Sequence, residues 1–333
     1  MRTRPTPRQR RQLLAGLFGL CAGRALAQWP AAAGRGLRLT VAYPPGGISD
    51  DTARELARRL EARLGLRVVV DHKPGAGGAV ALEALSRGRA EEAELCFSAI
   101  TPLLQLPHLP QAGPQRYDPA RDIAPVAAVM QTPVLVVATS ALQVTALADV
   151  IATARLKPGA LRWASSGHGT TGSLVLEQVR ATAGVDITHV PYAGGGQQIN
   201  DALAGHVELL STNVAARQLA YLRQGRLRAL AVGAPQRLAV LPEVPTLAEL
   251  GFPSANLVSL FGVFASARWD VERLEYWHGQ IAAVLREAEF RQRLLAVGNL
   301  PVEMSRQDFV RRIAAEAQAV RSPYGSGTAA PPR

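Results

Sequence analysis

The sequence predicts an α/β fold built from two packed domains. Short β-rich runs alternate with amphipathic helical stretches, a pattern typical of α/β proteins with largely parallel sheets. One unit, made of a strand, a loop of glycine and other small residues and then a helix, begins near residue 37 and returns near residue 161. The length of 333 residues suits two domains.

The individual elements follow from local periodicity and from turn residues. After a strand at 37–42, Ala53, Leu56, Ala57 and Leu60 recur at the spacing of one helix face. Further strands are expected at 68–70, 95–97, 134–138, 161–164, 188–190, 207–210, 227–232 and 260–265. Further helices are expected at 79–86, 148–154, 173–183, 197–204 and over most of the chain beyond 271.

Residues 1–27 have the three parts of an export signal. A basic start precedes an apolar stretch at 13–23, and Ala25-Leu26-Ala27 forms a small-residue cleavage site. The apolar stretch is shorter than the roughly 20 residues that span a bilayer. Arg10 and Arg11 also fit a twin-arginine signal, so the general and the twin-arginine routes both stay open. We therefore expect cleavage after Ala27 and a mature protein in the periplasm.

Composition excludes several classes of function. The leader carries six arginines and no acidic residue, so its removal lowers the formal net charge from +11 to +5. The other basic residues are scattered rather than interleaved with aromatic ones, so we expect no nucleic-acid partner. Cys96 is the only cysteine after the leader, and the histidines lack zinc-type spacing, so we expect neither a metal nor a cofactor. Residues 322–333, rich in small residues and proline, are expected to form a disordered tail.

The segment 43–50 is the first candidate binding loop. Two prolines stiffen its entry, and Gly46 and Gly47 allow a tight turn before the helix. Ser49, Asp50 or Asp51 can cap that helix, whose first N–H groups are then free to face an anion. An ordinary strand-to-helix turn has the same pattern, so the loop alone does not establish a ligand.

A second candidate loop occupies residues 165–172. Ser165 and Ser166 can donate hydroxyl hydrogen bonds to a ligand, or one of them can cap the following helix. His168 can reach a carboxylate or lie exposed, whereas His189 is interpreted as an ordinary strand residue. Tyr192, beside three glycines, can line a cleft or pack between domains.

Loops that follow strands are expected to face one another across a cleft, because ligands bind beyond the carboxyl ends of strands in open α/β sheets. That geometry is typical of a receptor that closes on its ligand. The sequence has no nucleophile elbow and no phosphate loop, so we do not expect an enzyme. An exported hydrolase that uses Ser98 with a histidine is the least favoured alternative. The loops concerned are 43–50, 98–101, 165–171 and 191–196.

A series of short motifs also occurs in a fixed order between residues 37 and 320. They are 43–47 with Asp50, 69–78, 117–126, 164–170, 189–192, 225–232 and 237–251. Together these motifs resemble those of the Bug family, the periplasmic solute-binding proteins of the tripartite tricarboxylate transporter type.

The resemblance implies the fold of a type II periplasmic binding protein, in which two α/β lobes joined by two crossover strands have a ligand cleft between them. Residues 36–138 and 258–321 would form the first lobe, and 139–257 the second. Members of the family bind small carboxylated solutes, largely through main-chain donors and ordered waters. Carried over by position, the ligand-binding residues are Tyr43, Gly46, Gly47, Asp50, Ser98, Ser165, Ser166, Gly169, Thr170 and Tyr192.

The chain departs from the family pattern at four places. Residues 89–94 replace an acidic-glycine-aromatic turn, and Ser173 stands where histidine is common. Ala193 stands where lysine often follows the tyrosine, and residues 211–213 replace a stretch that often carries aspartate. The solute of a typical member therefore cannot be carried over. It also stays open whether Asp50 or His168 touches the ligand.

The function that the resemblance implies is that of a monomeric receptor. Such a protein captures a small carboxylate and delivers it to membrane transporter subunits, without catalysis. A sensory binding protein that reports to a membrane signalling partner uses the same closure, so this alternative stays open.

Overall fold

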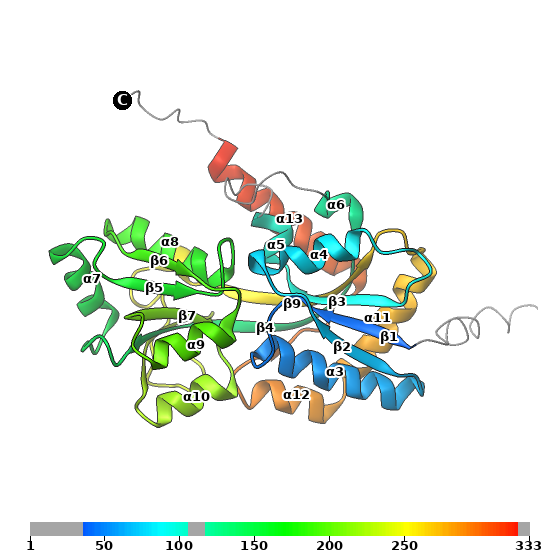
Figure 1. Cartoon of the computed structure of the whole chain (residues 1–333), viewed down its shortest axis with the longest axis horizontal. Helices are drawn as coiled ribbons and strands as arrows, with labels where there is room; N and C mark the ends of the chain where they lie inside the picture. Colours follow the sequence, from blue (N-terminus) through cyan, green and yellow to red (C-terminus); the bar gives the residue numbers. More distant parts are fainter. Residues whose placement is uncertain (1–35, 106–116, 326–333) are drawn as a thin grey trace, which may run out of the picture.

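The computed structural model describes residues 36–105 and 117–325, which form an elongated molecule in two halves (Figure 1). The predicted leader and the end of the predicted tail, residues 326–333, lie outside the described residues. The strands are β1 (Leu37–Val41), β2 (Val68–His72), β3 (Glu94–Ala99), β4 (Ile123–Thr139), β5 (Arg162–Ser165), β6 (Thr188–Pro191), β7 (Leu209–Asn213), β8 (Leu227–Gly233), β9 (Val258–Ser266) and β10 (Leu300–Pro301).

The long strand β4 is shared by the two halves. Up to Pro133 it pairs with β9 and β10, and from Val134 onward it pairs with β7 and β8. We call the half built on β1–β3, β9 and β10 lobe I, and the half built on β5–β8 lobe II. The chain passes to lobe II within β4 and returns at Val258, which pairs with Pro133. The lobe boundaries given above from the sequence stay a prediction.

The sheet is mixed rather than largely parallel, which corrects one expectation. β1 is parallel to β2 and β3, and β5 is parallel to β6 and β7. In the described chain, β7, β8, β9 and β10 all run antiparallel to β4, as β9 does to β3. The sequence did not predict residues 123–133 of β4 as a strand, because Pro125 and Pro133 lie within them and proline is disfavoured in a central strand.

Helices cover both faces of the strands. In Figure 1, α4 and α13 lie on one side of lobe I and α3 and α12 on the other, while α8 and α9 lie on opposite sides of lobe II. The sequence did not predict α5, α6 or α10, and α13 continues through residues 322–325 of the predicted tail. The helices are α3 (Ile48–Leu64), α4 (Ala79–Ser86), α5 (Thr101–Gln105), α6 (Pro119–Asp122), α7 (Leu147–Leu156), α8 (Thr171–Ala183), α9 (Gly195–Leu203), α10 (Ala216–Arg223), α11 (Val271–Leu285), α12 (Ala288–Leu295) and α13 (Arg306–Gly325), with short 3₁₀ turns at Ala76–Gly78 and Pro253–Ala255.

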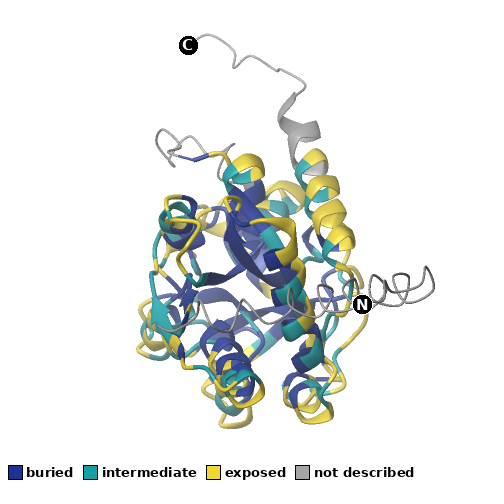
Figure 2. Cartoon of the chain, turned by 90° about the vertical axis from the view of Figure 1, so that its right-hand side faces the viewer, coloured by how far each residue is buried: buried dark blue, intermediate teal, exposed yellow. Residues whose placement is uncertain are grey.

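The strands form the buried centre of the molecule, and the helices expose their outer faces (Figure 2). Phe97 and Phe264 belong to the core of lobe I, and Trp163 belongs to that of lobe II. Cys96 is fully buried, as its apolar neighbours predict. Within the described residues, no helix combines the length and the apolar character needed to cross a membrane.

Candidate functional site

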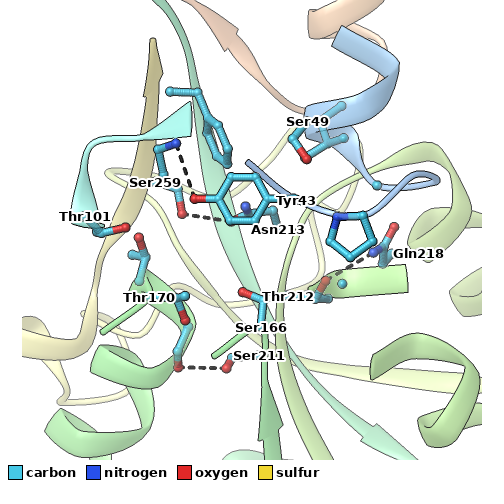
Figure 3. Close-up of a pocket in the computed structure, with 18 residues that line it drawn as sticks. Tyr43, Ser49, Thr101, Ser166, Thr170, Ser211, Thr212, Asn213, Gln218 and Ser259 are labelled. Atoms are coloured by element: carbon cyan, nitrogen blue, oxygen red, sulfur yellow. Dashed lines mark hydrogen bonds between the residues drawn. The ribbon is translucent and has the colours of Figure 1, made fainter. Parts of the chain in front are cut away.

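A cavity lies between the lobes and takes its lining from both (Figure 3). Lobe I contributes the loop that follows β1 and the residues Thr101, Ser259 and Phe261, while lobe II contributes the loop after β5 and residues 211–213 of β7. The space open to the centre of a water molecule is about 50 Å³, room for roughly three to five waters. A site of this size suits a small solute.

Three helices begin at this cavity. The first residues of α3, α8 and α9 line it, together with Gly47 and Thr170, the N-cap residues of α3 and α8. A helix N-terminus presents unpaired N–H groups and the positive end of the helix dipole. Among the described residues that line the cavity, none carries a charged side chain. The cavity therefore favours an anion through main-chain donors rather than through a cationic side chain.

Hydroxyl and amide groups supply the rest of the polar lining. Asn213 Oδ1 accepts a hydrogen bond from Ser259 Oγ at 2.8 Å, and Gln218 Nε2 donates to Thr212 Oγ1 at 3.1 Å (Figure 3). Gln218 Oε1 is buried and has no hydrogen-bond partner in the described part of the chain. The site thus offers both donors and acceptors to a bound solute.

Asp50 holds the first loop in place rather than lining the cavity. Its Oδ2 accepts a hydrogen bond from the Gly46 N–H at 2.9 Å, and Gly46 has a φ of +88°, which glycine adopts readily. Its Oδ1 lies 2.7 Å from His72 Nε2 and 2.8 Å from Arg54 Nε. The Asp50 side chain is 7% exposed. Both oxygens are engaged within the protein, and the Gly46 N–H is engaged as well.

Tyr43 contributes its ring to the cavity, but its hydroxyl is engaged with the backbone. The hydroxyl donates to Gly77 O and accepts from the Ala99 N–H, both at 3.3 Å. Burial raises the pKa of Tyr43 to about 12, while the neighbouring Ser98 hydroxyl opposes the shift. Ser98 itself is fully buried and does not line the cavity. The ring packs edge-on against Phe261, with centroids 5.8 Å apart.

The second loop is held by hydroxyl groups. Ser165 Oγ lies 2.7 Å from His189 Nε2 and donates to Gly167 O at 3.1 Å. Thr170 Oγ1 donates to Gly167 O at 2.7 Å and accepts from the Ser173 N–H at 3.4 Å. Ser165 is fully buried behind the loop, whereas Ser166 faces the cavity.

The remaining predicted residues lie beside the cavity rather than in its lining. Gly169 supports the turn with a φ of +68°. Tyr192 is half-buried, its N–H donates to Ser165 O, and burial together with Asp201 raises the pKa of its phenol to about 12. His168 is exposed and contacts His189 edge-on, with ring centroids 4.9 Å apart.

The structure thus places Tyr43, Gly47, Ser166 and Thr170 in the cavity lining. The other six predicted residues surround or support the two loops. Sequence reasoning missed Gln218 and the polar groups of β7 and β9, which line the cavity. One signal was present, because residues 211–213 depart from the family pattern.

Known proteins resemble this chain over most of its length. A family model described as "Tripartite tricarboxylate transporter family receptor" matches residues 52–322. The chain belongs to this receptor family. Protein BugT of Bordetella pertussis is 32% identical to it over 273 residues, which span 80% of this chain and 82% of BugT.

Two solved structures share the two-lobed α/β fold of this chain. The structure of R. palustris Rpa4515 with adipate is 31% identical, with a TM-score of 0.79 over 87% of this chain and 97% of that one. A structure of the periplasmic binding protein BugD is 21% identical, with a TM-score of 0.80 over 87% of this chain and 96% of that one, a likeness of fold alone. The receptor is accordingly a solute-binding protein and not an enzyme.

Proposed function

We propose that this receptor captures a small carboxylated solute between its lobes in the periplasm and delivers it to a membrane transporter of the tripartite tricarboxylate type. One observation carries the proposal. The N-termini of α3, α8 and α9 meet at a cavity whose described lining is polar and uncharged. Such a site stabilises an anion without a counter-charge.

The binding chemistry follows from the donors. A carboxylate accepts hydrogen bonds from the first N–H groups of the helices, and hydrogen bonds to a charged group are stronger than neutral ones. Hydroxyl groups such as those of Ser166 and Thr212 can donate to the remaining lone pairs. Closure of the lobes removes water and strengthens each of these interactions. No proton transfer or covalent step is needed.

The relatives support the class of solute and of partner. Rpa4515 was solved with adipate, a dicarboxylate, and the family is named for a transporter receptor. The leader at 1–27 supports export to the periplasm, with cleavage after Ala27. The proposed receptor is a monomer with its two lobes at the boundaries predicted from the sequence.

Calorimetry on ligand-stripped protein tests the proposal directly. A panel of malonate, succinate, malate, glutarate and adipate would be titrated, and thermal unfolding followed with each acid. Ligand at about 100 times its Kd adds about 2.7 kcal/mol to the free energy of unfolding, so the melting temperature should rise by several degrees. No binding and no rise with any acid would contradict a carboxylate receptor.

A matched pair of variants tests whether the solute binds in the cavity. Ser166→Trp puts a large ring into the space and should abolish the ligand-dependent rise in melting temperature. Leu156→Trp puts the same ring on the surface of lobe II, where Leu156 is 83% exposed, and should leave the rise intact. Equal responses of the two variants would place the solute elsewhere.

Uptake measurements in cells test the transporter partner. Deletion of the gene should abolish uptake of the acid that binds best. Normal uptake with loss of induced gene expression would instead support the sensory alternative.

A further inference from the structure

The lobes meet across the cleft at a glycine. A Cβ atom on Gly194 of lobe II would lie 2.2 Å from Pro44 Cδ and 2.8 Å from Pro44 Cγ of lobe I. Carbon atoms pack at about 3.5 Å or more, so no side chain fits at position 194 in this conformation. A second close contact joins the lobes nearby: a Cβ atom on Gly77 of lobe I would lie 3.0 Å from the backbone oxygen of His168 in lobe II.

Glycine is needed at position 194 because Pro44 lies so close, and not because of the backbone conformation there. Its φ of 163° and ψ of 173° describe extended backbone, which any residue adopts. Gly77 and Gly167 differ, because their φ values of +63° and +128° favour glycine whatever the surroundings. Position 194 therefore offers a clean way to change the closed contact without straining the chain.

The contact also adjoins the binding cavity. Pro44 lines the cavity from lobe I, and Gly195, the neighbour of Gly194, lines it from lobe II. The Pro44–Gly194 contact therefore limits how closely these two walls approach. The space left between the lobes has the room of roughly three to five waters, or about 90–150 Å³ of liquid.

We propose that Gly194, by letting Pro44 approach without an intervening side chain, sets the depth of closure and restricts the site to carboxylates of three or four carbon atoms. This inference rests on the proposed carboxylate-binding function. An alanine Cβ at position 194 would fall about 1.3 Å short of its packing distance from Pro44. The lobes of Gly194→Ala must therefore stay apart by about the length that one methylene group adds to a chain.

Titration of acids of increasing length tests the proposal. Wild type should bind succinate at least about tenfold more tightly than adipate. Gly194→Ala should lose about tenfold in succinate affinity and less than about threefold in adipate affinity, so the preference shrinks or reverses. Gly279→Ala in α11, where a Cβ meets nothing within 4 Å, is the control and should behave as wild type. An unchanged succinate-to-adipate ratio in Gly194→Ala would overturn the proposal.

A double-mutant cycle tests the contact itself. Pro44→Ala removes the Cγ and Cδ atoms that a Cβ at position 194 would meet. The loss of succinate affinity caused by Gly194→Ala should therefore be at most about threefold in the Pro44→Ala background. A loss of equal size in both backgrounds would show that Pro44 is not the obstacle, and would overturn the proposal.

A distance measurement separates this proposal from the function on which it rests. Spin labels on Leu156→Cys and Val69→Cys, exposed positions of lobes II and I, report the lobe separation in protein purified with its native ligand. Gly194→Ala should lengthen the distance of the closed population. If that distance lengthens while no acid of the panel binds, the carboxylate function fails and the closure contact stands. If acids bind but the distance is unchanged, the closure contact fails and the function stands.

Discussion

The loops at 43–50 and 165–171 share the same strand–loop–helix pattern, yet the protein holds them by different chemistry. The carboxylate of Asp50 holds the first, through the Gly46 N–H and the side chains of His72 and Arg54. Hydroxyl groups of Ser165 and Thr170 hold the second. The first loop thus depends on charge, and the second on neutral hydrogen bonds.

This difference changes what each helix offers to an anion. Thr170 caps α8 and accepts the Ser173 N–H, whereas Gly47 at the start of α3 has no side chain that could cap it. In the first loop the carboxylate binds a loop N–H, that of Gly46, and does not occupy the first N–H groups of α3. We therefore expect the first loop to dominate affinity, and the second to contribute less.

The largest effect is expected from Asp50→Ala. It removes the acceptor for the Gly46 N–H and leaves Arg54 without its buried partner. The free energy of unfolding should fall by about 2 kcal/mol, as when a hydrogen bond to a charged group is lost. Solute affinity should fall about 30-fold, because the loop is no longer preorganised. Denaturant unfolding and calorimetry measure the two quantities.

Asp186→Ala is the control for this variant. It removes an exposed carboxylate that pairs with Arg180 on lobe II, and exposed pairs contribute less than about 1 kcal/mol. If Asp50→Ala and Asp186→Ala had equal effects on affinity, the first loop would not be held by its buried charge.

Proline substitutions at the first residue of each helix compare the main-chain donors. Ile48→Pro and Thr171→Pro each remove one N–H at a position where proline is tolerated. The preceding residues, Gly47 and Thr170, already have extended backbone, which proline requires before it. A lost charge-assisted hydrogen bond of about 1.5 kcal/mol corresponds to about tenfold in affinity.

We expect Ile48→Pro to show this tenfold loss relative to Ile48→Ala. Thr171→Pro should lose about threefold relative to Thr171→Ala. The alanine variants correct for the lost side chains, both of which line the cavity. A larger loss at Thr171 than at Ile48, measured by calorimetry, would reverse the comparison between the two loops.

Sequence patterns locate these loops but not the side chains that face the cavity. Strand, loop and helix leave local signals, so β1, α3 and α8 lie close to where the sequence predicts them. Ser165 is the last residue of β5 and is buried, whereas Ser166 follows the strand and lines the cavity. Which of the two serines faces the ligand depends on how the strands and lobes pack, which a single sequence does not contain.

Long-range pairing also explains the missed lining residues. Asn213 and Ser259 come to the cavity because β7 and β9 both run antiparallel to β4. The sequence assigned only 134–138 of β4 to a strand, so it did not bring these elements together. Gln218 lies on α10, a helix that was not predicted.

The second loop is expected to lose stability at mildly acidic pH. Burial, with help from the nearby His168 and Arg180, lowers the pKa of His189 to about 4 from its usual 6.5. The unfolded chain therefore binds a proton more readily than the folded one, so stability falls as the pH falls from about 6.5 to about 4. Allowing for the partial exposure of His189, the free energy of unfolding at pH 5 should be about 1–2 kcal/mol lower than at neutral pH.

Thermal unfolding of wild type and His189→Gln between pH 7 and pH 4 measures this cost. Glutamine can still form a hydrogen bond with Ser165 but does not titrate in this range. The difference in melting temperature between wild type and His189→Gln should therefore narrow or reverse as the pH falls. A difference in melting temperature that stays constant across this range would show that protonation of His189 does not destabilise the second loop.

The smallest effect is expected from Thr170→Val, which removes the cap of α8 but keeps the shape of the side chain. Loss of an N-cap typically lowers the free energy of unfolding by about 1 kcal/mol. It also frees the Ser173 N–H, which offsets part of any loss in solute binding, so affinity should change by less than about threefold. Urea unfolding and calorimetry on this variant measure both. A loss of affinity as large as that of Asp50→Ala would mean that the hydroxyl-held loop, and not the charge-held one, organises the site.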